Sequence, residues 1–177
     1  DFTPGTDDDD ATSYDIAARR ANPVRWVSGI ESDVISATSA SEWRRTGKVT
    51  PADSAIRCIS YEGAAQTEPI ETPEAIAYVH QTKSLIQALT VKSLGQQIPT
   101  FENTNLSYTA DHLSGGGYKQ LAYSHYPYRN VLALRNDGNI ACCTYDKKQG
   151  VVAWSTWETS GSYESVAVAS VDASATT

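Results

Sequence analysis

Few residues in this chain have the types and spacing that catalysis or metal binding requires. The three histidines, His80, His112 and His125, lie far apart and match no metal-binding or nucleophile motif. Asp111 precedes His112, but adjacent residues of a helix do not face each other, so the pair is not predicted to act as an acid and base. We therefore expect no catalytic residue, no metal site and no cofactor.

The adjacent cysteines Cys142 and Cys143 are the next candidates for a reactive site. Neighbouring residues of a strand point to opposite faces, so the two thiols cannot easily share one metal. With Cys58 as the third cysteine, the chain has too few for a disulfide framework. We expect the pair to be buried packing residues, because free cysteine is among the most buried residue types.

Trp154 and Trp157 raise the same question, since exposed aromatic rings can stack on sugars. Residues three apart in a strand also point to opposite faces. One tryptophan is therefore predicted to pack in a core and the other against a neighbouring sheet or subunit. Stacking on a carbohydrate ligand is the functional alternative.

The elements that position these residues are mostly strands. Short runs rich in Val, Ile, Thr and Trp recur between turn residues, and Ala75 to Val91 is predicted to form a hairpin. From Tyr118 onward, four or five such runs are joined by turns that contain Gly or Asn. The predicted fold class is all-β, built of antiparallel meanders like those of a β-propeller blade or a small barrel.

One short helix is also predicted. Leu106, Ala110 and Leu113 have helical spacing, Asn105 is a candidate cap, and the glycines at 115–117 end the segment. The glycine run lacks the Lys-Ser/Thr of a phosphate-binding loop and follows the helix rather than opening it, so it predicts a flexible stop.

Charge and composition exclude several classes of function. The net charge is -7 and the pI is near 4.9, which disfavours a general nucleic-acid binder because phosphates are held by clustered Lys and Arg. No apolar run approaches the roughly 20 residues that span a bilayer, so no membrane segment is predicted. The chain contains no methionine, from which we expect an excerpt or a processed piece of a longer protein.

Four consecutive aspartates, Asp7–Asp10, mark the N-terminal region. They lack the alternating ligands and the turn glycine of a calcium loop, so a solvated loop is predicted, with a cation site as the alternative. The predicted organisation is an acidic loop or tether at 1–22, a β-rich segment at 23–103, a short helix with a four- to five-stranded meander at 104–171, and a tail at 172–177.

The order of these elements resembles one known family. The resemblance spans about Pro23 to Val168, and its C-terminal hairpins are the most specific part. The matching pieces are Arg25-Trp26, Thr38 to Trp43, Thr50-Pro51, Arg57, Tyr61, Gly63, the segment SYTADHL at 107–113, Arg135 to Gly138, Thr144 to Asp146, Gln149, Val152 to Trp154, Thr159, Gly161 and Glu164 to Val168. They resemble the central segment of the tail nozzle, or tail tubular protein B-like, proteins of short-tailed bacteriophages and prophages.

This resemblance implies a virion structural protein that carries part of a β-propeller. It implies a ring of copies, usually six, below the portal and adaptor, lining the channel through which double-stranded DNA leaves without sequence-specific binding. The expected location is the virion tail, after synthesis in the host cytoplasm. The family has no catalytic site to carry over.

The matched residues have structural roles in this interpretation. Asp137 and Gly138 are expected to form a turn, and the remaining residues are expected to serve in packing, at strand ends or in turns: Trp43, Tyr145, Trp154, Trp157 and Gly161. The alternative functions are a carbohydrate-binding or depolymerising tail module, and a soluble all-β domain with another partner.

Overall fold

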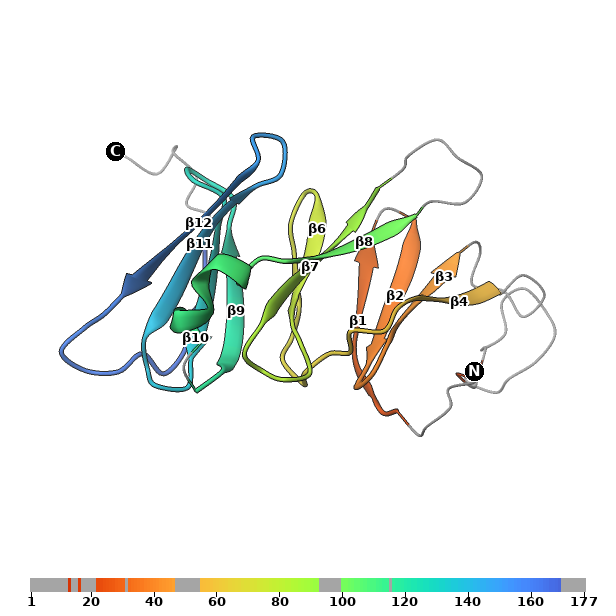
Figure 1. Cartoon of the computed structure of the whole chain (residues 1–177), viewed down its shortest axis with the longest axis horizontal. Helices are drawn as coiled ribbons and strands as arrows, with labels where there is room; N and C mark the ends of the chain where they lie inside the picture. The colour runs from red at the N-terminus through yellow and green to blue at the C-terminus, as the bar shows by residue number, and fades with distance from the viewer. Residues whose placement is uncertain are drawn as a thin grey trace.

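A computed structural model describes Ser13, Ile16 and residues 22–30, 32–46, 55–92, 100–114 and 116–169. The predicted loop at Asp7–Asp10 and the predicted tail lie outside the described residues. The described residues form twelve strands in three four-stranded sheets, and every pairing is antiparallel. In each sheet the strands are neighbours in chain order, so each sheet is a meander (Figure 1). This confirms the predicted all-β class and its antiparallel meanders.

The first two sheets come from the N-terminal half of the chain. The first contains β1 (Val24–Ile30), β2 (Asp33–Thr38), β3 (Glu42–Thr46) and β4 (Ala55–Ser60). The second contains β5 (Ile70–Glu71), β6 (Ala75–Val79), β7 (Ile86–Val91) and β8 (Phe101–Asn105). β6 and β7 form the hairpin that the sequence predicted between Ala75 and Val91.

The third sheet follows a short helical segment. It contains β9 (Tyr118–Ser124), β10 (Asn130–Arg135), β11 (Ile140–Asp146) and β12 (Val151–Trp157). The fifth candidate strand, from Tyr163 onward, belongs to none of the three sheets over its described residues. The meander therefore has four strands rather than five.

The helix expected from Leu106 to Leu113 is shorter and tighter than predicted. A 3₁₀-helix, η1, covers Tyr108–Leu113 and has a non-helical conformation at Ala110. Leu106 instead extends the pairing of β8, because its amide donates to the carbonyl of Ile86 over 2.9 Å. Ser107, rather than the expected Asn105, occupies the N-cap position of η1; Asn105 Oδ1 accepts from the amide and the hydroxyl of Ser107, both at 2.9 Å.

The sheets stack face to face in chain order, which makes the molecule elongated (Figure 1). Alternate residues of β6 point to the two neighbouring sheets: Ile76 and Tyr78 lie in the core with the first sheet, and Ala75 and Val79 in the core with the third. All five residues of β6 are buried. A strand that is covered on both faces reads as a continuous apolar run, and this strand does.

One backbone contact recurs where the chain leaves a sheet: twice on the way to the next sheet, and once after the third. The linker amide of Ala64 donates to the carbonyl of Thr38, at the end of β2, over 2.9 Å. The amide of Tyr118 donates to the carbonyl of Lys83, between β6 and β7, also over 2.9 Å. The amide of Tyr163 donates to the carbonyl of Gly138, between β10 and β11, over 2.8 Å. We call these three contacts the first, second and third joints.

The joints bring two backbones close together. A Cβ at Gly63, which precedes Ala64 and has φ +76°, would lie 2.5 Å from the carbonyl oxygen of Ser39. In the third joint the glycine is on the turn instead: Gly138 has φ +83°, and a Cβ there would lie 2.7 Å from Cβ of Ser162. Glycine is needed at each position because it accepts positive φ and leaves room for the opposing chain.

We expect Gly63→Ala to destabilise the protein by about 2 to 5 kcal/mol, from left-handed strain plus a clash with backbone. Gly150→Ala is the matched control, because Gly150 has φ +66° but no atom within 4 Å of the added Cβ. It should cost only about 1 to 2 kcal/mol. Urea unfolding measures both, and equal losses for the two variants would contradict the close approach at the first joint.

Candidate assembly surfaces

The described residues contain no group of three or more His, Cys, Asp or Glu side chains able to hold a metal ion. His80 is buried, with Nδ1 3.0 Å from the hydroxyl of Thr82 and Nε2 3.6 Å from Glu62. His112 lies in η1, and His125 follows β9 with its ring 6.2 Å from that of Tyr123. The three histidines are therefore held in separate local contacts.

The adjacent cysteines lie on opposite faces of β11. Cys143 is buried between the second and third sheets, where loss of hydration raises the pKa of its thiol to about 12. Cys142 is buried on the outer face of the third sheet, with a pKa that is also raised by burial. Both thiols stay protonated at neutral pH, and neither forms a disulfide.

The two tryptophans of β12 likewise take opposite faces. The indole N–H of Trp154 donates to the carbonyl of Leu106 over 2.8 Å, and its ring packs on the core between the second and third sheets. Trp157 pairs with Ile140 and keeps 44% of its surface exposed. Trp43, in β3, lines the outer face of the first sheet and donates its indole N–H to the hydroxyl of Ser41 over 2.8 Å.

The other residues expected to be structural occupy turns and the core. Asp137 precedes Gly138 in the turn of the third joint, and its Oδ1 accepts from the amide of Asn139 over 3.1 Å. Tyr145 is buried beside the second sheet, and burial raises its pKa to about 12. At Gly161 a Cβ would meet no atom within 4 Å, so packing does not require glycine there.

A buried carboxyl group at the first joint was not identified from the sequence. Glu42 is 0% exposed, although its strand, β3, is made mostly of polar residues. The hydroxyls of Ser60 and Tyr78 and the amides of Glu62 and Gly63 lie near it, but neither carboxyl oxygen has a partner in good hydrogen-bond geometry among the described residues. Desolvation therefore dominates and raises the pKa of Glu42.

A ring contact connects the first two sheets near this carboxyl group, and an ion pair within the first sheet holds its arginine. Arg44 Nε donates to Asp33 Oδ2 over 2.6 Å, and both side chains are only 7% exposed. The guanidinium of Arg44 also lies 5.2 Å from the ring centroid of Phe101 in β8. A pair this well buried fixes geometry more than it adds net stability, because desolvation offsets most of the attraction.

A second charged cluster connects the other two sheets. Arg129 lies 3.5 Å from Glu74 and 3.4 Å from Asp146, and Lys148 lies 3.6 Å from Glu74. Glu74 precedes β6, whereas the other three residues belong to the third sheet and its loops. These contacts cross from one sheet to the next at the end opposite the joint turns.

Both ends of the stack carry apolar surface. On the outer face of the first sheet, a hollow of about 230 Å³ has a mixed lining. Its apolar residues are Ile16, Val24, Val27, Val34, Trp43 and Ile56, and its polar ones are Ser36, Arg44 and Arg45. Val24 and Val27 are 52% and 58% exposed. This hollow offers mainly apolar contact area.

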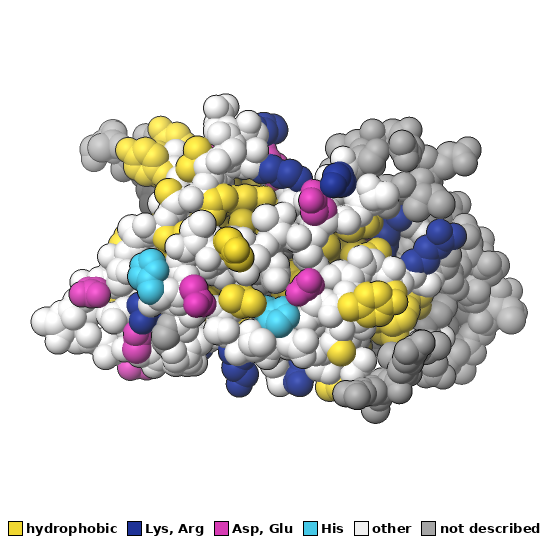
Figure 2. Space-filling view, viewed as in Figure 1, with side chains coloured by type: hydrophobic (Ala, Val, Ile, Leu, Met, Phe, Trp, Pro, Cys, Tyr) yellow, Lys and Arg dark blue, Asp and Glu magenta, His cyan; other side chains and the backbone are white. Residues whose placement is uncertain are grey.

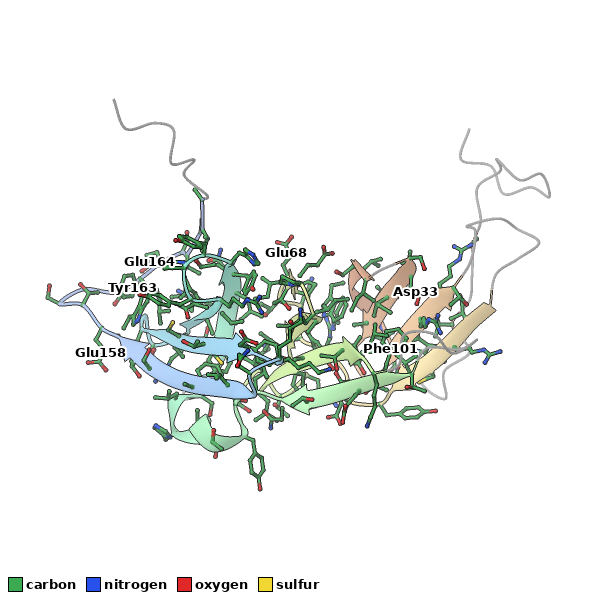
Figure 3. The ribbon with its side chains drawn as sticks, turned by 90° about the horizontal axis from the view of Figure 1, so that it is seen from above. Asp33, Glu68, Phe101, Glu158, Tyr163 and Glu164 are labelled. Carbon is green, nitrogen blue, oxygen red and sulfur yellow. The ribbon has the colours of Figure 1, made fainter. Side chains whose placement is uncertain are left out.

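At the other end, the outer face of the third sheet is partly covered by the chain that follows β12. Tyr163 and Val166 pack on Leu132, Leu134, Ile140 and their neighbours. Gln120 of β9 holds Val166 at both backbone groups, donating to its carbonyl over 2.8 Å and accepting from its amide over 3.0 Å. Figure 3 shows Tyr163 and Glu164 at this end of the molecule, far from Asp33.

The chain matches no protein-family model, and a search of curated proteins finds none similar to it. Among the described residues, no helix has the length and apolar character needed to cross a lipid bilayer.

We expect the buried carboxyl group to make stability depend on pH. Because the folded state raises the pKa of Glu42, native protein binds that proton more tightly than unfolded protein does. Its contribution is thus favourable below the ordinary carboxyl pKa and is lost as pH rises through the raised value. Glu42→Gln should remove this slope and stabilise the protein at neutral pH.

Urea unfolding of both proteins between mildly acidic and neutral pH measures the effect, with Glu158→Gln, at an exposed position, as the matched control. Parallel pH profiles for wild type and Glu42→Gln would contradict the assignment of a destabilising buried carboxylate.

Proposed function

We propose that the three sheets are consecutive blades of a β-propeller, and that the chain is a structural subunit of a bacteriophage tail nozzle. The observation that carries this proposal is the joint: the same amide-to-carbonyl contact occurs at 2.9 Å in both passages between successive meanders, and at 2.8 Å where the chain leaves the third. A constant contact gives each sheet the same relation to the one before it. Radial repetition of four-stranded meanders is the principle of a propeller.

The positions of the matching residues support a role in assembly. Asp137 and Gly138 lie in the third joint, and Tyr145 and Trp154 lie between two sheets. Only a small pocket of about 10 Å³, lined by Tyr145 with Glu74 and Arg129, adjoins any of the four among the pockets of the described residues. A protein that works by packing into a larger structure places its characteristic residues in turns and cores in this way.

In the proposed tail, copies of the chain form a ring, usually of six, against the adaptor and other tail proteins. Closed rings of identical subunits are the common way to build a tube. Double-stranded DNA would pass through without being bound, and the net charge of -7 suits a wall that does not hold phosphates.

Carbohydrate binding is the second candidate, and one loop favours it. Tyr126 and Tyr128, on either side of Pro127, are 85% and 69% exposed. Exposed tyrosine rings offer flat apolar faces of the kind that stack on sugars. On this alternative, the chain would be a glycan-binding or depolymerising tail module with its ligand at the loop between β9 and β10.

The decisive experiment is antibody labelling of purified particles from the source of the chain, imaged by electron microscopy. We expect label at a single vertex, on the tail, because a nozzle subunit occurs only there. Antibody absorbed with the purified chain is the control and should leave the particles bare.

Label on fibres would contradict the nozzle and favour the glycan module. In that case, Tyr126→Ala with Tyr128→Ala should abolish retention on host glycans. Particles without label would overturn both tail functions.

A further inference from the structure

We infer that residues 163–169 are the first strand of a further four-stranded meander, which the polypeptide that follows Ala169 completes on the outer face of the third sheet. The inference goes beyond the proposed function, because a straight stack of sheets and a closed propeller would both continue in this way. Four features of the described residues carry it: the sequence and packing of the segment, its place beside β9, the linker before it and its unpaired edge.

The segment repeats the sequence and the packing of β9. It reads YESVAVA, against YKQLAYS in β9, and each stretch begins with the tyrosine whose amide makes a joint. Tyr118 and Leu121, the first and fourth residues of β9, pack in the core between the second and third sheets. Tyr163 and Val166 occupy the same two places in the segment and pack on the outer face of the third sheet. Each pair thus faces the preceding sheet, as a first strand of the next sheet does.

The segment also lies where a first strand belongs. β1 lies next to β5, and β5 lies next to β9, so the first strands of the three sheets form a row in chain order. Gln120 of β9 contacts the segment in turn, because its side chain bonds to both backbone groups of Val166, at 2.8 and 3.0 Å. Residues 163–169 therefore continue the row.

A turn of each sheet holds the chain that leads into its first strand. In all three sheets, the turn between the second and third strands donates a backbone amide to a carbonyl of that leading chain. In two sheets, the donor residue also uses its side-chain amide on the preceding carbonyl: Gln81 on Glu62 over 2.8 Å, and Asn136 on Gly116. The backbone bonds run from Ser39 to Pro23 over 3.2 Å, from Gln81 to Gly63 over 3.1 Å, and from Asn136 to Gly117 over 2.9 Å.

The linker before residues 163–169 presents the same carbonyl. Ser162 occupies the position of Gly63 and Gly117, directly before the residue whose amide makes the joint. No backbone amide in the part of the chain that the structure describes donates to the carbonyl of Ser162. The turn of a further sheet would supply that donor, as it does for the three sheets before it.

Strand geometry identifies the edge that a second strand would pair with. The N–H and C=O of one strand residue point to the same side, and those of its neighbours point to the other. Gln120 bonds to both groups of Val166, so the groups of Ser165 and Ala167 point away from β9. No strand among the described residues pairs with them. An edge with unpaired backbone groups is a template for another strand.

The chain's own continuation is the partner that fits this edge. Strands that follow one another in the chain are neighbours in all three sheets, and β9 reaches β10 after residues 125–129 alone. A first strand is therefore paired by the stretch that comes directly after it. Figure 2 shows acidic and basic side chains scattered over the face in view, so charge marks no site there for a separate molecule. A sheet added in this way would also cover Trp157, which is 44% exposed.

Hydrogen exchange measured by mass spectrometry tests the pairing, because an amide bonded to a second strand exchanges more slowly. It compares the 177-residue chain with the protein extended by the residues that follow it at its source, over one further interval between joints. In the 177-residue chain, the amides of residues 163–169 should exchange at least about tenfold faster than those of β9. In the extended protein they should slow at least about tenfold, while β9, the internal control, should not change.

Ala167→Pro distinguishes strand pairing from simple shielding. Proline has no amide to donate, so this variant should lower the protection of the segment at least about tenfold in the extended protein. It should leave exchange in the shorter chain unchanged. Ala167→Ser keeps the amide at this exposed position and is the matched control, which should exchange as the parent protein does. Unchanged protection of β6 and β10 checks that each variant is folded.

Equal exchange of residues 163–169 in the two proteins would overturn the inference. So would protection that survives Ala167→Pro, which would show cover without strand pairing, or a source polypeptide that ends at Thr177. None of these results bears on where the chain lies in a particle, so failure here and failure of the tail function are separable.

Discussion

The close approach of each linker to a turn of the preceding sheet is the constraint on which the stack depends. Each joint is one backbone hydrogen bond, and the first two fix where the next sheet starts relative to the last. The approach leaves no room for side chains on both backbones. Gly63 meets this requirement on the linker of the first joint, whereas Gly138 meets it on the turn of the third and faces Ser162. The requirement belongs to the contact, so the glycine can move from one side to the other.

The two interfaces between sheets reach the same geometry with different chemistry. Between the second and third sheets, small residues dominate the core, among them Ala75, Ala88, Ala133 and Ala141. Small side chains let backbones approach, and the described residues that make up this core carry no charge. Between the first and second sheets, the ring of Trp26 lies 5.3 Å from that of Tyr78, beside the buried Glu42. The interface between the first and second sheets therefore carries the cost of desolvating Glu42. Its stability should depend on whether that carboxyl group is protonated.

Sequence reasoning succeeded where a local rule decided the structure. Strand periodicity places Cys142 and Cys143, and Trp154 and Trp157, on opposite faces, because alternation along a strand needs no knowledge of its partner. The prediction was wrong at Leu106. Its spacing with Ala110 and Leu113 fits a helix, but its amide bonds to Ile86 of the neighbouring strand instead. The joints and the burial of Glu42 depend on contacts between distant segments. Two joints do share a local signal, a positive-φ glycine directly before the donor residue at Gly63 and Gly117, but the third joint has Ser162 at that position.

The two outer faces of the stack differ in how far they are covered. A stack that ends in solvent normally has a polar outer face on its last unit. The apolar outer face of the third sheet, with Leu132 and Ile140, is instead covered in part by Tyr163 and Val166 of the chain that follows β12. On the first sheet, Val24 and Val27 remain 52% and 58% exposed beside a hollow. The chain thus shields one terminal face with its own segment and leaves apolar surface on the other, and surface of that kind favours contact with further protein.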